Sequence, residues 1–262
     1  MSINRIKAML LHEFFITKRT YSVINDIVVY PMLSIIIFGF LTLYLTRVSG
    51  SIVASYVLMG IVLWQVISIT QYSISVGCLW DVWAKNLTNI FISPISIGEY
   101  LISYTISGTI KALIVIFFGS LISYYIFHFN LLNLGIFNLF IFFFNLVIFA
   151  FAFGIFILGL LFRFGNKIQA LSWSLITFFQ PLMAVIYPVS VLPQPLRSIA
   201  YLFPPTYIFE SARMVLSTKQ INWTYIGIAF ILNCVYCFIA ILFFKLMYRL
   251  SKESGEFAKL EL

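Results

Sequence analysis

The chain has 262 residues, of which 62% are hydrophobic and only 9% are charged. Soluble domains carry about a quarter charged residues, so this composition leaves too few charges to cover a soluble protein. It also excludes a disordered chain, and three cysteines are too few to hold this length as a disulfide scaffold. The net charge of +8 is typical of cytoplasmic loops near anionic headgroups, so we expect membrane lipids, and not nucleic acid, as a partner.

The first segment, Met1–Tyr21, is predicted to be a helix lying in the membrane interface. Ile3, Ile6, Leu10 and Phe14 share one face of such a helix, and Arg5, His12 and Arg19 lie opposite. The alternative is a basic tail without fixed structure.

Six apolar stretches are long enough to cross a bilayer as helices, which takes about 20 residues. They do not alternate with period two, so they are not barrel strands. The sequence therefore predicts an all-α integral membrane protein in which residues 1–262 form a single transmembrane domain. The six predicted spans are Ile27–Leu45, Ile52–Val76, Tyr100–Phe127, Leu134–Leu161, Ile168–Tyr187 and Tyr225–Tyr248.

The positive charges predict the orientation of these spans. With the N-terminus inside, eleven of the 16 lysines and arginines, from Arg5 to Lys259, fall on the inner side. Four fall outside, and Lys111 lies within the third span. The excess of inner cations places both termini in the cytoplasm.

The loop Asp81–Glu99 follows the second span and is too apolar for a solvated connection. Trp83, Leu87, Ile90 and Phe91 recur at helical spacing, and Ser93-Pro94 then ends the helix. We expect a short cytoplasmic helix with an apolar face. Either a protein partner covers that face, or the spans and headgroups of the chain's own membrane bury it.

Lys111 is the charge expected inside the membrane, close to the middle of the third span. A lysine at this depth should face a polar cavity, a carboxylate or a subunit contact. The alternative is that the span is shifted and the long side chain reaches the interface.

Residues 188–222 hold five of the chain's eight prolines. Two short helices are predicted between them, Leu196–Phe203 and Thr206–Leu216, each too short to cross the membrane. Their apolar character favours re-entrant helices on the outer side over a surface loop with amphipathic pieces. Glu210 and Arg213, three residues apart, are expected to pair.

No residues are predicted to be catalytic or to bind a metal. The chain has no phosphate-binding loop and no hydrolase motif. His12 and His128 fall on opposite faces of the membrane, and Cys234 and Cys237 lie within the last span, where they are expected to pack as small apolar residues. A source of energy for transport would therefore lie outside this chain.

Two segments resemble the transmembrane subunits of ABC-2 type ABC transporters, an exporter class. LTNIFISPISIGE at Leu87–Glu99 is similar to the family's L-x-x-[ST]-P-[IV]-S segment with its following acidic residue. YPVSVLPQPLRSIAYLFPPTYIFESARMVL at Tyr187–Leu216 is similar to its P-x-x-x-L-P…P-x-x-Y-x-x-E-x-x-R pattern.

The resemblance implies a permease subunit, most simply a homodimer and alternatively a heterodimer, in the inner cell membrane. It binds no cofactor, because a separate cytoplasmic ATPase would hold ATP and Mg²⁺. The segment 81–99 would be the coupling helix that docks on this ATPase, with Met1–Tyr21 also touching it. The residues implied for coupling are Trp83, Leu87, Ile90, Phe91, Ser93, Pro94 and Glu99. Those implied for the outer gate or pathway are Leu192, Pro193, Pro205, Tyr207, Glu210 and Arg213.

The sequence leaves the substrate open among a polysaccharide or lipid-linked glycan, a lipid and a drug. Some polysaccharide exporters of this class have Phe-Pro where this chain has Ser93-Pro94. Two other functions also stay open. One is a membrane-embedded enzyme acting on lipid with Lys111, Glu210 and Arg213 near the headgroups, and the other is a membrane scaffold without transport.

Overall fold

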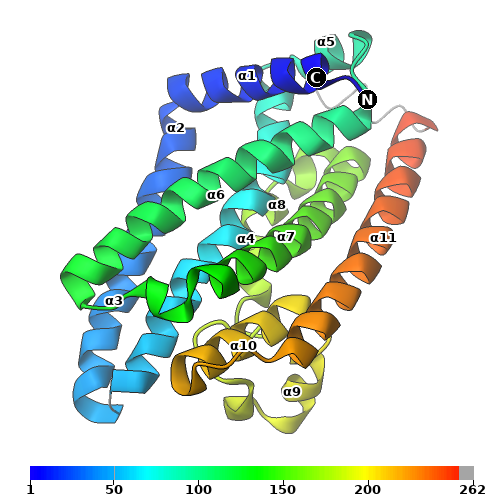
Figure 1. Ribbon diagram of the computed structural model, residues 1–262. Coiled ribbons are helices and arrows are strands. Elements are labelled where there is room, and N and C mark those ends of the chain that lie inside the picture. Colours follow the sequence, from blue (N-terminus) through cyan, green and yellow to red (C-terminus); the bar gives the residue numbers. More distant parts are fainter. Residues whose placement is uncertain (50, 254–262) are drawn as a thin grey trace.

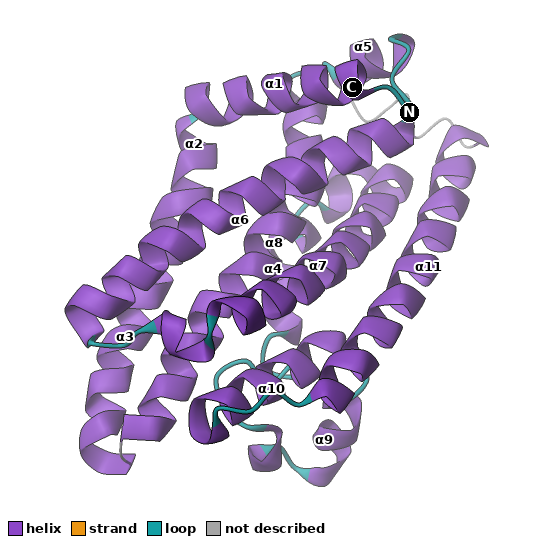
Figure 2. Cartoon of the chain, viewed as in Figure 1, coloured by secondary structure: helices purple, strands orange, loops and turns teal. Residues whose placement is uncertain are grey.

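The structure is a computed structural model that describes residues 1–49 and 51–253 (Figure 1). Lys259 and the side chain of Phe91 lie outside the described part. Every regular element in the described residues is helical, as predicted (Figure 2). The chain is a multi-pass membrane protein, since five helices are long and apolar enough to cross a bilayer.

Five of the six predicted spans are confirmed as long helices. The first is composite: α2 (Tyr21–Ile24), a π-helical turn at Asn25–Val29 and α3 (Tyr30–Ser49) follow one another. The other four are α4 (Ser51–Trp83), α6 (Ile97–Phe127), α7 (Ile136–Phe164) and α11 (Trp223–Glu253). A 3₁₀ turn at Leu131–Leu134 joins α6 to α7.

The predicted fifth span, Ile168–Tyr187, is not a span-length helix, so the count of six is not confirmed. After a 3₁₀ turn at Gly165–Ile168, α8 (Leu171–Phe179) has only nine residues. The helix ends just before Pro181, which has no N–H to continue it, and Ala184 then takes a left-handed conformation with φ 51°. The segment 180–187 consequently forms turns where a helix was expected.

The two short helices expected after this segment are confirmed. A 3₁₀ turn at Val189–Val191 leads to α9 (Gln194–Ala200) and α10 (Pro204–Thr218). Each of the two helices carries a proline in its first turn, where an N–H has no helical partner. Both lie at the end of the bundle opposite to α1 (Ile3–Arg19) and α5 (Leu87–Ile92) (Figure 1). We call these the α10 end and the α1 end.

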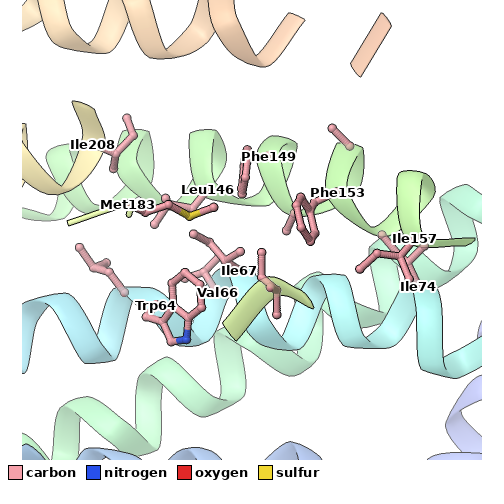
Figure 3. Close-up of a cluster of buried hydrophobic side chains, with 14 of the residues drawn as sticks. Trp64, Val66, Ile67, Ile74, Leu146, Phe149, Phe153, Ile157, Met183 and Ile208 are labelled. Carbon is pink, nitrogen blue, oxygen red and sulfur yellow. The ribbon is translucent and has the colours of Figure 1, made fainter. Parts of the chain in front are cut away.

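The core is organised around α4, the most buried of the five long helices. Figure 3 shows its side chains packing against α7, where Ile74 lies beside Ile157. Gly154 of α7 and Gly108 of α6 face α4 at distances that leave little room for a side chain. Small residues at these crossings let the helices approach closely, as is usual in membranes.

The helix expected over Met1–Tyr21 is present as α1, and its predicted apolar stripe lies at the surface of the bundle, with Ile6 and Leu10 half-buried. Ile3 and Phe14 are exposed, whereas Met9 and Glu13 are buried against the bundle. Glu13 has a charged partner on α6, described below, and it lies on the side of α1 that faces the bundle.

Candidate functional site

A buried ion pair joins α1 to α6 at the α1 end. The Lys111 ammonium donates to Glu13 Oε1 at 2.6 Å, and both side chains are buried. Burial raises the pKa of Glu13 above its ordinary value, and the nearby Lys111 charge opposes that rise. The lysine predicted within the third span therefore faces a carboxylate, one of the three environments expected for it.

A second carboxylate, Asp81 near the end of α4, lies in the same region. The hydroxyls of Tyr100 and Tyr104 on α6 both donate to Asp81 Oδ2, at 2.8 and 2.6 Å. His12 Nε2 of α1 lies 3.7 Å from Asp81 Oδ1. Asp81 thereby joins α4 to α6 through two buried hydrogen bonds, which cost much more to break than exposed ones, and it lies near α1 through the partly exposed His12.

Glu99 joins the start of α6 to the start of α1. Its carboxylate accepts from its own capping partner, the Ser96 N–H, and from the Ser2 N–H at 2.6 Å. Arg5 lies 3.6 Å from the same carboxylate. With the Glu13–Lys111 pair, this contact holds α1 to α6 at two points far apart along α1.

The short helix predicted in the loop Asp81–Glu99 is α5, but two of its expected docking residues point inward. Leu87 and Ile90 are only 1% and 7% exposed and belong to the main hydrophobic core. Of the two alternatives for this apolar face, burial by the chain's own spans therefore holds for Leu87 and Ile90. Among the described side chains of α5, Ile92 is the exposed apolar one, at 79%.

The other residues predicted for coupling surround α5. Pro94 is exposed, and Ser93 is half-buried as the residue that ends the helix. Trp83, the last residue of α4, is partly exposed and stacks on Trp173 of α8 with ring centroids 6.1 Å apart. The end of α4 is thus connected to α5 through the loop and to α8 through the aromatic pair.

At the α10 end, Arg213 and Glu210 pair as predicted, with Arg213 Nη1 donating to Glu210 Oε1 at 2.8 Å. Arg213 also donates through Nη2 to the carbonyl oxygens of Ala184 and Val185. Glu210 accepts from the Val189 N–H at 2.8 Å. The pair therefore supplies hydrogen-bond partners to the backbone of the turn that replaces the predicted fifth span, which we call the 184–189 turn.

Burial lowers the pKa of Arg213 from its ordinary value, and the Glu210 carboxylate opposes this effect. An arginine remains charged under such conditions, and its planar group suits simultaneous contacts with a carboxylate and carbonyl oxygens. The pair is consequently a structural clamp on irregular backbone, which membranes tolerate only where its polar groups are satisfied.

Gly60 of α4 completes the clamp from the other side. A Cβ at this position would overlap the carbonyl oxygen of Val185, which is backbone and cannot rotate away. We expect Gly60→Ala to displace the 184–189 turn and to destabilise the protein by about 1–3 kcal/mol, as overpacking does. Thermal unfolding in detergent measures this. Gly227→Ala on α11, where a Cβ meets nothing within 4 Å, is the control and should be neutral or stabilising; equal losses in both variants would contradict the expectation.

The remaining residues predicted for the outer gate are not brought together as one site. Leu192 and Pro205 are buried, and Pro193 is exposed. Tyr207 is half-buried, with its ring 5.5 Å from that of Tyr201 and 5.6 Å from that of Tyr225. These residues shape the packing of α9 and α10 on the bundle.

A cavity of about 420 Å³ lies between α3, α4 and α8. Aromatic rings line it, among them Tyr30, Trp64 and Trp173. Its polar lining includes Asp26, which accepts from the Tyr72 hydroxyl at 2.7 Å, and Gln71, which donates to the Ser172 carbonyl at 3.1 Å. The further polar side chains are those of Ser34, Gln65, Ser68, Ser172, Thr177 and Gln180.

This concentration of amides, hydroxyls and rings is unusual in so apolar a bundle. Cavities of this size, with a few polar groups among aromatic walls, are typical of ligand sites.

The family model for the ABC-2 type transporter matches residues 4–217. The chain belongs to the ABC-2 type transporter family. The match runs from α1 almost to the end of α10, so it includes the α1 end, the cavity and the clamp, and it confirms the resemblance found in the sequence. A comparison with curated proteins gives no match. As an ABC-2 membrane domain, the chain is the transport part of its system and not the ATPase.

Sequence reasoning missed several residues of these sites. Glu13 is 98 residues from Lys111, so no spacing rule connects them. Asp81 was placed only at a loop boundary, and its tyrosine partners lie on another helix. The need of Lys111 for a carboxylate was the one signal that could have led to Glu13, the sole acidic residue of the N-terminal helix.

Proposed function

We propose that the chain is the permease subunit of an ATP-driven exporter, powered by a separate cytoplasmic ATPase that binds ATP and Mg²⁺. Two copies would enclose the path, as a homodimer or alternatively a heterodimer. The observation that carries this proposal is the arrangement of α1, α5 and α6 at the α1 end. There, α5 presents Ile92 to the outside while α1 is fixed to α6 by buried charges. A partner that moves α5 and α1 would therefore move the spans with them.

The proposal places the α1 end in the cytoplasm and the protein in the inner membrane. The excess of lysines and arginines on this side supports that orientation. Exposed Ile3 and Phe14 on α1 are suited to the interface between headgroups and hydrocarbon. The α10 end would then face outward, with α9 and α10 as the re-entrant helices of the gate.

The cavity between α3, α4 and α8 is the part of the path in which we expect substrate to bind. Aromatic faces combined with amide and hydroxyl groups suit a ligand that has both apolar rings and hydroxyls. This favours an amphiphilic substrate, of which a lipid-linked glycan fits best, ahead of a simple lipid or a drug. The clamp of Glu210 and Arg213 would hold the outer end of this path in shape.

The enzyme alternative is weakened by the contacts of its candidate residues. Lys111 is paired with Glu13, and Arg213 is occupied by Glu210 and two carbonyl oxygens. Groups held in this way fix helices and are poorly placed to handle a substrate. The scaffold alternative differs in that ATP would then have no effect on the conformation of the chain.

The proposal is tested by changing the exposed residue of α5. We expect Ile92→Glu to abolish co-purification of the ATPase from native membranes and to leave the permease inserted, because the side chain is 79% exposed. Phe164→Glu, an exposed apolar residue at the end of α7, is the control and should retain the ATPase. ATPase bound normally by Ile92→Glu would argue against docking at α5.

A further inference from the structure

A second cavity, of about 390 Å³, opens between the start of α6, α7 and the last turns of α11. Its walls are almost wholly apolar, with Leu101, Phe151 and Ile241 among them. The two side chains with polar ends are Lys245 and Tyr248, both on α11. Because the start of α6 belongs to the α1 end, these polar groups lie at that end of the groove (Figure 1).

The cavity continues as a groove between α6 and α7. A smaller cavity of about 260 Å³ shares Ile102 and Phe151 with the first and extends toward Ile106 and Val147. Thr105 is the one polar residue in its lining. Its hydroxyl donates to the Leu101 carbonyl at 2.8 Å, so the hydroxyl is satisfied within α6 and the wall of the cavity is apolar. Together the two cavities form an elongated apolar groove with a cation at one end.

The charge of Lys245 has no acidic partner among the described residues. Each acidic side chain in the described part of the chain has a hydrogen-bond or ion-pair partner other than Lys245. The pairs are Glu13 with Lys111, Asp26 with Tyr72, Asp81 with Tyr100 and Tyr104, Glu99 with Ser2 and Arg5, Glu210 with Arg213, and Glu253 with Arg249. A second cation, Lys252, lies 4.7 Å from the Tyr248 ring and adds positive potential near the same end.

We propose that this groove binds an anionic phospholipid, with one acyl chain along α6 and α7 and the headgroup phosphate at Lys245. The groove is flanked by exposed apolar residues, Ile106 on α6 and Leu242 on α11, so it opens toward hydrocarbon. A water-soluble ligand would have to cross that surface to enter. Basic side chains at helix ends are the usual partners of anionic headgroups in membranes.

This site is separate from the cavity between α3, α4 and α8, and the proposal does not depend on what the protein transports. The lipid would be a bound component that holds α11 to α6 across a groove, where the protein alone leaves space. Its removal should therefore loosen α11.

Gly98 offers a way to close the groove without changing a charge. It lines the cavity in the first turn of α6, and a Cβ there meets nothing within 4 Å. Gly98→Leu would fill the mouth of the groove, and leucine favours helix over glycine, so folding should not suffer. Lys245→Gln removes the charge and keeps the shape.

The test is native mass spectrometry of the purified full chain in mild detergent, with added phosphatidylglycerol or phosphatidylcholine at equal concentration. We expect the wild type to retain one phosphatidylglycerol in preference to phosphatidylcholine. Lys245→Gln should reduce that preference about fivefold, which is the effect of one lysine near a lipid headgroup. Gly98→Leu should reduce retention of both lipids. Glycerol 3-phosphate, which has no acyl chain, should not compete.

The control is Lys18→Gln on α1, an exposed lysine at the same end that does not line the groove. It should leave the preference unchanged. The proposal is overturned if Lys18→Gln and Lys245→Gln reduce the preference equally, since general attraction of anions would then suffice. It is also overturned if Gly98→Leu retains lipid as the wild type does, or if the wild type does not distinguish the two lipids.

Discussion

Lys111→Met is expected to destabilise the protein by about 3–5 kcal/mol, the cost of leaving one member of a buried ion pair without its partner. Glu13 would then be a buried carboxylate with no cation within hydrogen-bond distance among the described residues. Because this pair is one of the two contacts that hold α1 to α6, the C-terminal half of α1 should also loosen. Thermal unfolding measures the first effect, and protease cleavage of the N-terminal segment measures the second.

A double variant separates the contribution of the ion pair to stability from the contributions of its two residues. Glu13→Leu alone should also destabilise the protein, because it leaves the Lys111 charge unpaired. Glu13→Leu combined with Lys111→Met should recover most of the loss, since replacing both charges by apolar groups is often neutral. Additive losses in the double variant would show that the two residues stabilise the fold through other contacts.

Arg213→Met is expected to cost a similar amount, about 3–5 kcal/mol, and to abolish transport. The carbonyl oxygens of Ala184 and Val185 would lose their donor, and Glu210 would keep only the Val189 N–H. Without these bonds, two buried carbonyl oxygens of the 184–189 turn lose their donor, which should loosen the packing of the turn on α10. Thermal unfolding and a transport assay in reconstituted vesicles measure the two effects.

Arg249→Met is the matched control for charge. Its pair with Glu253 has the same 2.8 Å distance, but both side chains are exposed, and such pairs contribute about 0–1 kcal/mol. Arg213→Lys tests geometry, because an ammonium cannot replace the planar group in three contacts at once. If Arg213→Lys is as stable as the wild type, charge alone holds the turn, and the separate hydrogen bonds of the guanidinium group are unimportant.

Hydropathy was sufficient to predict most of the fold. Long apolar runs specify helices in lipid because no other element satisfies the backbone there, and five predicted spans appear as such. The same measure failed at Ile168–Tyr187, where the composition is apolar but the backbone turns. Hydropathy cannot indicate the left-handed conformation of Ala184 or a turn whose carbonyl oxygens bind Arg213, a residue almost 30 positions later.

The sites were predictable only where the partners are near in sequence. Glu210 and Arg213 are three residues apart on one helix, so their pairing followed from helix geometry. Leu87 and Ile90 show the limit of the same rule, since spacing defines a helix face but not what lies against it. The position of Lys111 within a predicted span indicated that it needed a polar or acidic partner, and only the fold identified that partner as Glu13.

The joint between α1 and the first span also has a mechanical consequence. Thr20 is extended, with φ −103° and ψ 106°, and a π-helical turn follows five residues later, so two breaks in regular helix separate α1 from α3. The backbone is therefore a compliant link at this point, whereas the contacts of Glu13 and Glu99, which join α1 to α6, are stiff. A push on α1 is accordingly expected to reach α6 first, through contacts between residues 97 and 98 positions apart in the chain, and only later the span that α1 directly precedes.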